Sequence, residues 1–460
     1  MKIGAEALKT FFVFLIFTIT SSCFSQQWNF VPSPNPDNAR NLLRGVWANS
    51  SNDVWAVGES GLLPSLNLTE HWDGANWSVI NSPSPGLQTN VLNAVQGLSA
   101  NNVYAVGYKS DFGTPQMMAL HWDGSSWTQQ STPTVTGGSA FQCIAVLGPE
   151  DIYAGGYKAV GAPGPTQGTL ITHWNGSSWN IESTPNQSAN RSNTITNIKG
   201  LSSNDIWASG YSRTVAGTYK AMMLHKTGSG WDLVTVPQPG LENFLYQIDI
   251  VASDNIWVAG QYNDGTQYRV FFLHYNGSSW TVEYSPGGGG GAGIVHNSPN
   301  DIWSAGSSFA HYDGTSWNTI SAALPNESSM LYMSGVSTSD IWTVGRYYEG
   351  NNLKTLTMHY GGTTMISNTN TIIRDYKLLQ NYPNPFNPVT NIEFSISKSG
   401  YISLKIFDMS GKEITAVVND ELNTGNYKYK FDASNLASGI YFYTLTAENF
   451  SDTKSMILLK

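Results

Sequence analysis

The sequence predicts an all-β chain: a seven-bladed β-propeller closed by an N-terminal strand, followed by a small Ig-like β-sandwich. A phrase close to Asp-Ile-Trp-x-x-Gly occurs seven times, and each copy precedes a phrase close to His-Trp-Asp-Gly-Ser-Ser-Trp. This repeat of about 40–50 residues consists of short β-type runs, which is typical of propeller blades. After the last repeat, apolar and polar residues alternate along several short runs, as in half-buried strands. We expect the propeller to span residues 26–366, with a linker at 367–376 and the second domain at 377–460.

The N-terminal segment has the pattern of a secretory signal peptide. Lys2 and Lys9 precede an apolar run at residues 11–19, and small serines follow, the last being Ser25. The apolar run is too short to cross a bilayer, so cleavage after residue 25 leaves a mature chain without a predicted transmembrane span. A lipoprotein leader acylated at Cys23 is the alternative.

The charge balance disfavours two classes of partner. Only 12% of the residues are charged, and the formal net charge is −9. Such a surface repels phosphate backbones and anionic lipid headgroups, so we expect neither a nucleic-acid-binding nor a membrane-surface protein.

One repeat unit, residues 91–133, illustrates the blade. It contains four strand-length runs that are rich in β-branched or aromatic residues and separated by turn formers. An Asp-Gly or Asn-Gly pair between the third and fourth runs is a strong hairpin signal, because these residues tolerate positive φ. A single four-stranded sheet cannot bury both of its faces, so each blade needs a neighbour on either side, and a closed ring supplies both.

The two ends of the propeller complement each other. The seventh unit keeps His359-Tyr-Gly-Gly but then lacks the Ser-Ser-Trp of the other units. The missing strand is found at the beginning of the mature chain, where residues 28–34 resemble residues 77–83. We therefore expect the N-terminal strand to complete the last blade.

The repeated histidines and aromatic residues are predicted to be structural. Equivalent atoms of neighbouring blades lie about 10 Å apart, whereas zinc ligands lie about 2 Å from their ion. The repeated histidines therefore cannot share a metal, and we expect each to tie the third strand to a nearby turn. The eighth histidine, His296, is expected to be solvated. The aromatic residues of the second and fourth strands are expected to pack between blades. Neither a cofactor nor a metal is expected.

The loops between the second and third strands differ from blade to blade, and variable loops on a rigid ring commonly carry binding residues. Tyrosines beside carboxylates in these loops suit a glycan, although a protein ligand fits the same pattern. The candidate binding residues are Tyr108, Asp111, Tyr157, Tyr211, Tyr262, Asp264, Tyr348 and Glu349.

Three alternatives remain open at this stage. The tyrosines can simply cap strand ends. The chain can be a polysaccharide-degrading enzyme, a glycosidase or a lyase, because loop carboxylates from different blades can supply the pair that glycoside cleavage needs. It can also be a structural component of a surface layer. No familiar catalytic motif appears in the sequence, so we favour a non-catalytic binding module.

The tail resembles a known sorting domain. Residues 382–388 read Tyr-Pro-Asn-Pro-Phe-Asn-Pro, and residues 406–411 and 436–441 supply further blocks in the expected order. In these blocks the chain resembles the type A C-terminal sorting domain of the type IX (Por) secretion system. The resemblance implies recognition by that secretion machinery, and a protein that is secreted or attached to the outer surface of a Gram-negative bacterium. The residues that carry the sorting signal are Tyr382, Pro383, Asn384, Pro385, Phe386, Gly411, Gly439 and Lys460.

Overall fold

The computed structural model describes residues 27–459, apart from gaps at 161–165, 189–190, 229, 285–290, 338–339, 362–375, 382, 399, 423–424, 434–435 and 449. The predicted leader with Cys23, all of the predicted linker except residue 376, and the sorting residues Tyr382 and Lys460 therefore lie outside the described residues. The chain divides into two compact units, residues 1–364 and 365–460.

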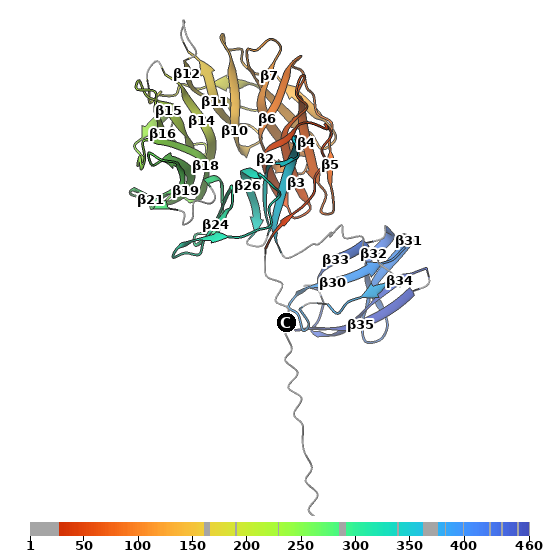
Figure 1. Cartoon of the computed structure of the whole chain (residues 1–460). Coiled ribbons are helices and arrows are strands. Elements are labelled where there is room, and N and C mark those ends of the chain that lie inside the picture. Colours follow the sequence, from red (N-terminus) through yellow and green to blue (C-terminus); the bar gives the residue numbers. More distant parts are fainter. Residues whose placement is uncertain are drawn as a thin grey trace, which may run out of the picture. The chain divides into compact units, whose positions relative to one another are not determined.

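The first unit is a propeller of seven four-stranded antiparallel sheets (Figure 1). Blade 1 contains β2 (Asn41–Ser50), β3 (Asp53–Ser60), β4 (Leu66–Trp72) and β5 (Trp77–Val79). Blade 2 contains β6 (Thr89–Ser99), β7 (Asn102–Ser110), β8 (Gln116–Trp122) and β9 (Trp127–Gln130). Blade 3 contains β10 (Ser139–Gly148), β11 (Asp151–Ala159), β12 (Gln167–Trp174) and β13 (Trp179–Ile181). Blade 4 contains β14 (Asn193–Ser202), β15 (Asp205–Arg213), β16 (Tyr219–Thr227) and β17 (Gly230–Val234).

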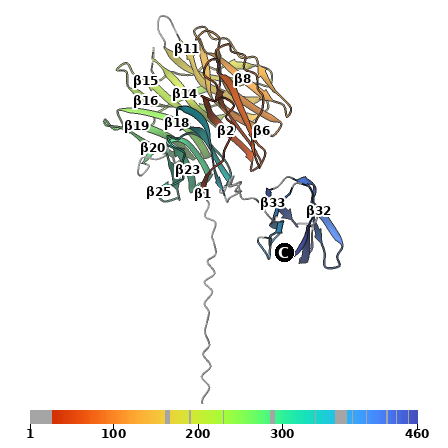
Figure 2. The ribbon, with the colours of Figure 1, turned by 45° about the vertical axis from the view of Figure 1, so that its right-hand side comes forward.

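The remaining blades continue the ring. Blade 5 contains β18 (Glu242–Ala252), β19 (Asn255–Asn263), β20 (Tyr268–Tyr275) and β21 (Trp280–Tyr284). Blade 6 contains β22 (Gly291–Ser298), β23 (Asp301–Gly306), β24 (Phe309–Tyr312) and β25 (Trp317–Ile320). Blade 7 contains β26 (Ser329–Ser337), β27 (Asp340–Glu349), β28 (Asn352–Gly361) and β1 (Gln27–Phe30). The first strand of each blade contacts the first strands of both neighbouring blades, so β2, β6, β10, β14, β18, β22 and β26 form the inside of the ring (β2, β6, β14 and β18 are labelled in Figure 2). Residues of all seven strands line a central channel.

The predicted closure by the N-terminal strand is confirmed. β1 pairs with β28 in antiparallel register, with Trp28 opposite Tyr360. Trp28 is 5% exposed and stacks on Phe309 of blade 6 at a ring-centroid distance of 4.0 Å. The strand from the start of the chain therefore fills the fourth place in the last blade.

The repeated aromatic residues pack between blades, as predicted. In six of the seven blades the Trp at the beginning of the fourth strand meets, edge to face, the second-strand aromatic residue of the preceding blade, a geometry that aromatic pairs favour. Trp127 lies 5.2 Å from Trp55, and Trp77 lies 5.4 Å from Trp342, measured between ring centroids. Trp28 makes the same contact with Trp303 at 5.8 Å.

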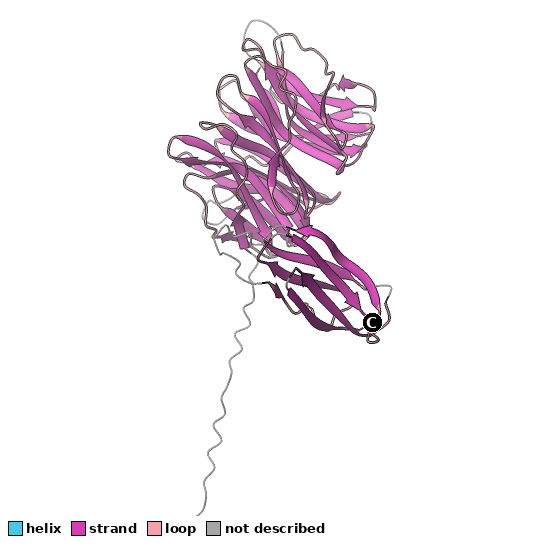
Figure 3. Ribbon diagram, turned by 90° about the vertical axis from the view of Figure 1, so that its right-hand side faces the viewer, coloured by secondary structure: helices cyan, strands magenta, loops and turns pink. Residues whose placement is uncertain are grey.

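The second unit is a small β-sandwich. One sheet contains β29 (Lys377–Leu378), β30 (Val389–Ile396) and β33 (Gly425–Asp432). The other contains β32 (Glu413–Leu422), β31 (Gly400–Phe407), β34 (Gly439–Ala447) and β35 (Phe450–Leu458). Side chains from both sheets form one apolar core, which includes Phe394, Ile406 and Tyr443. The described part of both units consists of strands and loops (Figure 3).

Candidate functional site

The inner strand of every blade carries a β-bulge at the same place. In blade 1 the pairing with the second strand skips one residue between Leu43 and Gly45. Five other inner strands also skip one residue at this place, and that of blade 5 skips two. A bulge leaves its extra residue unpaired and turns it away from the ladder. The bulge residues line a cavity in the channel, and they are Arg44, Asn93, Gln142, Thr196, Tyr246 with Gln247, Ala292 and Leu331.

This channel cavity has a volume of about 480 Å³. It lies at the end of the channel nearest to the variable loops between second and third strands, which we call the variable-loop face. Tyr157 and Tyr211, which follow the repeat glycines of blades 3 and 4, line it together with Tyr246. Burial raises the pKa of Tyr157 and of Tyr211, and raises that of Tyr246 to about 12. All three hydroxyls therefore keep their protons near neutral pH and can both donate and accept hydrogen bonds.

A second hollow of about 510 Å³ adjoins the channel cavity on the variable-loop face. Tyr108 of blade 2 lines this hollow, and Tyr157 and Gln167 line both the hollow and the channel cavity. Three of the tyrosines that the sequence singled out, Tyr108, Tyr157 and Tyr211, therefore form one continuous lining across blades 2 to 4.

The three predicted carboxylates line neither space. Asp111 is exposed and accepts a hydrogen bond of 2.9 Å from the amide of Leu87. Asp264 is ion-paired with Arg269 and accepts hydrogen bonds from the turn that follows it. Glu349 is exposed at the end of β27. Each lies on a different blade, so the structure does not bring these acids together.

Two predicted tyrosines also lie away from the cavity lining. Tyr262 packs edge to face against Phe271 and Tyr284, with centroids 5.9 Å apart in each case. Tyr348 is 38% exposed near the end of β27. For Tyr262 the packing fits the alternative in which a tyrosine caps a strand end.

An ion cluster borders the channel cavity at blade 1. Glu59 Oε1 accepts from Arg44 Nη2 at 2.7 Å and from Arg40 Nη2 at 2.9 Å. The Glu59 side chain is only 6% exposed. Burial alone would raise the pKa of Glu59, but the charges and hydrogen bonds of Arg44 and Arg40 outweigh it and lower that pKa. Glu59 is thus an ionised counter-ion, whereas Arg44 lines the cavity.

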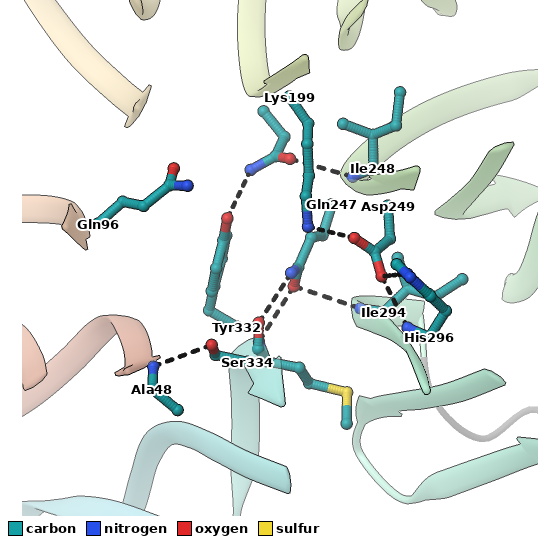
Figure 4. A network of polar contacts seen from close by, with 12 residues as sticks. Ala48, Gln96, Lys199, Gln247, Ile248, Asp249, Ile294, His296, Tyr332 and Ser334 are labelled. Carbon is teal, nitrogen blue, oxygen red and sulfur yellow. Dashed lines mark hydrogen bonds and ion pairs between the residues drawn. The ribbon is translucent and has the colours of Figure 1, made fainter. Parts of the chain in front are cut away.

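Polar side chains cross the channel below this cavity (Figure 4). Asn197 of blade 4 donates to the hydroxyl of Tyr332 of blade 7 at 3.0 Å. Gln247 of blade 5 donates to the carbonyl of Met333 at 2.9 Å and accepts from its amide at 3.0 Å. Gln247 and Tyr332 line the channel cavity and also a smaller one of about 320 Å³ toward the other end. This polar belt therefore divides the channel into two cavities.

The smaller cavity contains a charged triad. Asp249 of blade 5 is 1% exposed and binds Lys199 of blade 4 and His296 of blade 6. His296 donates from its backbone amide at 2.7 Å and contacts Asp249 through Nδ1 at 2.6 Å. The expectation that His296 is merely solvated was wrong, because its ring is tied to a buried carboxylate. Burial works against the charge of Asp249, but Lys199 and His296 outweigh it and lower its pKa. The triad links three blades.

The seven repeated histidines have the predicted role. Each ring Nε2 lies within hydrogen-bond distance of the Asp or Asn that follows the turn between the first two strands, at 2.7–3.0 Å. The pairs are His71 with Asp53, His121 with Asn102, His173 with Asp151, His225 with Asp205, His274 with Asn255, His311 with Asp301 and His359 with Asp340.

Sequence reasoning missed the bulge residues, although they leave a signal. The flanking positions are mostly apolar and repeat from blade to blade, whereas the bulge position changes from Arg44 to Gln142 to Leu331. A position that varies within an otherwise repeated strand indicates a side chain that does not pack in the apolar core between blades. Arg44 was missed because only the loops between second and third strands were considered as carriers of binding residues.

The sorting residues of the second unit fasten its first segment to its last strand. Asn384 Oδ1 accepts from the amide of Ile457 at 2.8 Å. Phe386 is 2% exposed, and its amide donates to the Ile457 carbonyl at 2.9 Å. The carbonyl of Pro383 accepts a hydrogen bond from the Thr390 hydroxyl. Pro385 lies between Asn384 and Phe386 in the sequence.

Of the two sorting glycines, Gly411 lies in a turn and Gly439 at the beginning of a strand. Gly411 has a φ of 81° in a turn where Asp408 Oδ1 accepts from the amides of Ser410 and Lys412. A residue with a side chain would be strained there. Gly439 begins β34, and a Cβ atom at that position would meet nothing within 4 Å.

Comparisons with known proteins identify the second unit. Residues 380–459 match the family described as the secretion system C-terminal sorting domain. This domain belongs to the type IX secretion system, so the chain interacts with that machinery and is secreted across the outer membrane of a Gram-negative bacterium. Within the described residues, no helix is long and apolar enough to cross a membrane. No curated protein matches the chain in sequence.

Solved structures resemble the propeller at low sequence identity. An ulvan lyase of polysaccharide lyase family PL25 has a TM-score of 0.51 at 10% identity, covering 73% of this chain and 96% of that one. PorZ, a surface component of the type IX secretion system of the human oral bacterium Porphyromonas gingivalis, has a TM-score of 0.47 at 14% identity. That match covers 93% of this chain and 60% of PorZ, so this chain spans less than two thirds of PorZ. YCF48 from Cyanidioschyzon merolae has a TM-score of 0.46 at 15% identity, covering 74% of this chain and all of YCF48. At such identities the likeness shows the propeller fold alone.

Proposed function

We propose that this type IX secretion cargo is a non-catalytic propeller that binds a glycan in the channel cavity of its variable-loop face. The observation that carries the proposal is the composition of the cavity lining. Tyr157, Tyr211 and Tyr246 lie there together with amide side chains such as Gln142 and Gln167.

This lining suits the chemistry of sugars. A sugar ring offers an apolar face, which stacks on an aromatic ring, and hydroxyls, which exchange hydrogen bonds with amides and phenols. A volume of about 480 Å³ falls within the range of small-ligand sites, and the adjoining hollow beside Tyr108 extends the space for a longer chain.

The alternative, a glycosidase that uses carboxylates, has less support. Glycoside cleavage commonly needs two carboxyl groups within about 10 Å of each other. No Asp or Glu is found among the described residues that line the channel cavity or the adjoining hollow. The nearby Glu59 is held by two arginines with a lowered pKa, which is the reverse of what a general acid requires. The cavity tyrosines have raised pKa values, which makes them poor general bases.

The test is equilibrium binding of the full chain to an array of polysaccharides, with every hit also assayed for new reducing ends and unsaturated sugar products. We expect binding without cleavage. Tyr157→Ala and Tyr211→Ala should each weaken binding about tenfold, because each removes a stacking surface and a hydroxyl. Tyr284→Ala, which removes a 55% exposed tyrosine outside the cavity, is the control and should bind normally.

Three results would overturn the proposal. Product formation on any hit would make the chain an enzyme. Equal binding by all three variants would move the site away from the cavity. The third result is a full chain that unfolds cooperatively on heating, and is therefore folded, but binds no glycan. The remaining functions would then be binding of a protein ligand or a purely structural role at the cell surface.

A further inference from the structure

We propose that the glycan bound in the channel cavity carries an anionic group, a sugar carboxylate or sulfate, and that Arg44 binds this group. The inference rests on the proposed function and narrows its ligand class. It starts from the cluster of Arg40, Arg44 and Glu59, which the sequence did not identify.

The cluster carries an uncompensated positive charge at the cavity wall. Two guanidinium groups share a single carboxylate oxygen, Glu59 Oε1. The charges of the two arginines and the ionised Glu59 sum to +2 − 1 = +1. Arg44 is the only charged residue among the described residues that line the cavity. An anion placed in the cavity therefore meets a cation and no described carboxylate on the lining.

Arg44 also has an unused donor. Its Nη2 is occupied by Glu59, whereas its Nε is buried and has no hydrogen-bond partner among the described residues. A buried N–H without an acceptor costs free energy, and the cost is larger for a charged group. The Arg44 side chain as a whole is 31% exposed, so an oxyanion in the cavity can reach the guanidinium and form a charge-assisted hydrogen bond with it. Arginine is the side chain best suited to planar recognition of carboxylates.

The rest of the lining complements an anion. The hydroxyls of Tyr157 and Tyr211 retain their protons because burial raises their pKa values, so both can donate to an oxyanion. The amide groups of Gln142 and Gln167 provide further donors. The site is positive although the whole chain has a net charge of −9, so an acidic glycan is attracted at this site rather than by the general surface.

The experiment uses matched probes and variants of the full chain. The probes are a uronate oligosaccharide, the same oligosaccharide with its carboxyls reduced to alcohols, and a sulfated oligosaccharide. Arg44→Gln removes the cavity cation and leaves Arg40 to pair with Glu59. Arg191→Gln removes a charge from an exposed loop position outside the cavity lining and is the control. Binding is measured by titration calorimetry at low and high salt, and folding by thermal melting.

We expect at least one acidic probe to bind about tenfold or more tightly than the reduced probe, with an affinity that falls as salt rises. Arg44→Gln should abolish this preference, and Arg191→Gln should keep it. The acidic probe that binds more tightly identifies the ligand group as carboxylate or sulfate. Equal affinity for acidic and reduced probes, or an unchanged preference in a folded Arg44→Gln protein, overturns the inference and leaves the proposed function standing. If no glycan binds, both fail.

Discussion

At the scale of single residues, the most unusual side chain outside the channel is Glu70 in β4. Its position in the strand register corresponds to Leu120 in blade 2 and Leu224 in blade 4. Glu70 is fully buried, and neither carboxyl oxygen has a hydrogen-bond partner within normal geometry among the described residues. Burial raises the pKa of Glu70 to about 8, because a buried carboxylate is poorly solvated inside a protein, and this effect outweighs the nearby Ser33 side chain, which lowers the pKa.

This raised pKa makes the stability of the propeller depend on pH. Between about pH 4.5, the ordinary value, and about pH 8, the folded state keeps a proton that the unfolded state has lost. As far as Glu70 is concerned, the free energy of unfolding is therefore highest below pH 4.5. It falls by about 1.4 kcal/mol per pH unit as the pH rises from 4.5 to 8. Glu70→Gln is neutral in both states, so we expect its melting temperature to exceed that of the parent by several degrees at pH 8 and to match it near pH 4.5.

Thermal melts across this pH range test the prediction. The control is Glu150→Gln, which changes an exposed glutamate and should shift the melting temperature equally little at every pH. A gain for Glu70→Gln that is the same at pH 5 as at pH 8 would show that Glu70 does not hold the proton.

The sequence predicts the structural role of residues that recur in every blade, but not that of residues that occur in one blade only. The bond between His71 and Asp53 could be foreseen because six further histidines occupy the same place in the repeat, each after an Asp or Asn at the beginning of the second strand, and a repeated pair implies a shared structural contact. Arg44 and Glu70 occur once each. Arg44 pairs with Glu59 of its own blade, but the cavity that it lines is completed by residues from all the other blades, and no local pattern reveals such a lining.

At the scale of elements, the last strand of the sorting domain depends on a segment about 70 residues earlier in the chain. Phe386 exchanges backbone hydrogen bonds with Ile457 and Leu459 on either side of Leu458, and its ring enters the core of the sandwich. Phe386→Ala should destabilise the domain by about 3–5 kcal/mol, because it leaves a cavity under β35. Hydrogen exchange of the β35 amides in the full chain measures this loss.

The control for this prediction is Tyr401→Ala, which removes an aromatic ring that is 57% exposed. Its β35 amides should remain as protected as those of the parent. Parent-like protection in Phe386→Ala would mean that the segment around Phe386 does not hold the last strand.

Strand order is predictable from the repeat, whereas strand irregularity is not. Four runs with alternating or continuous apolar character define a blade, and turn residues separate them, so the order from β6 to β9 follows from the sequence. The bulge between Leu92 and Ala94 does not, because the extra residue is visible only as a shift of pairing between two strands. The candidate cavity is lined by these bulge residues. Because the bulges could not be predicted, the sequence placed the whole site in the variable loops and none of it on the inner strands.

At the scale of the whole molecule, the channel is asymmetric. The belt of Asn197, Gln247 and Tyr332 joins blades 4 and 5 to blade 7 across the ring, and the triad of Lys199, Asp249 and His296 joins blades 4, 5 and 6 on one side of it. The channel cavity on the other side keeps Arg44 and the tyrosines. The charged contacts that join blades in the channel therefore lie toward one end of it. At the variable-loop end the blades are joined by neutral hydrogen bonds, such as the one from Asn93 to the Phe141 carbonyl, and Arg44 remains for a ligand.

Closure of this ring by β1 leads to the last prediction. Deleting residues 27–36 exposes the edge of β28 and removes Trp28 from its contacts with Trp303 and Phe309. A single core truncation typically lowers the melting temperature by several degrees. We expect the deletion to lower it by clearly more, because hydrogen bonds and apolar burial are lost together. Trp28→Ala keeps the strand and should give a smaller decrease. Because the strand folds onto the ring as a separate segment, an excess of the peptide 27–36 should raise the melting temperature of the deleted protein by mass action. A deleted protein that melts like the parent would show that the ring is held by the contacts between inner strands alone. A destabilised protein that the peptide does not rescue would contradict docking of β1 as a separate segment.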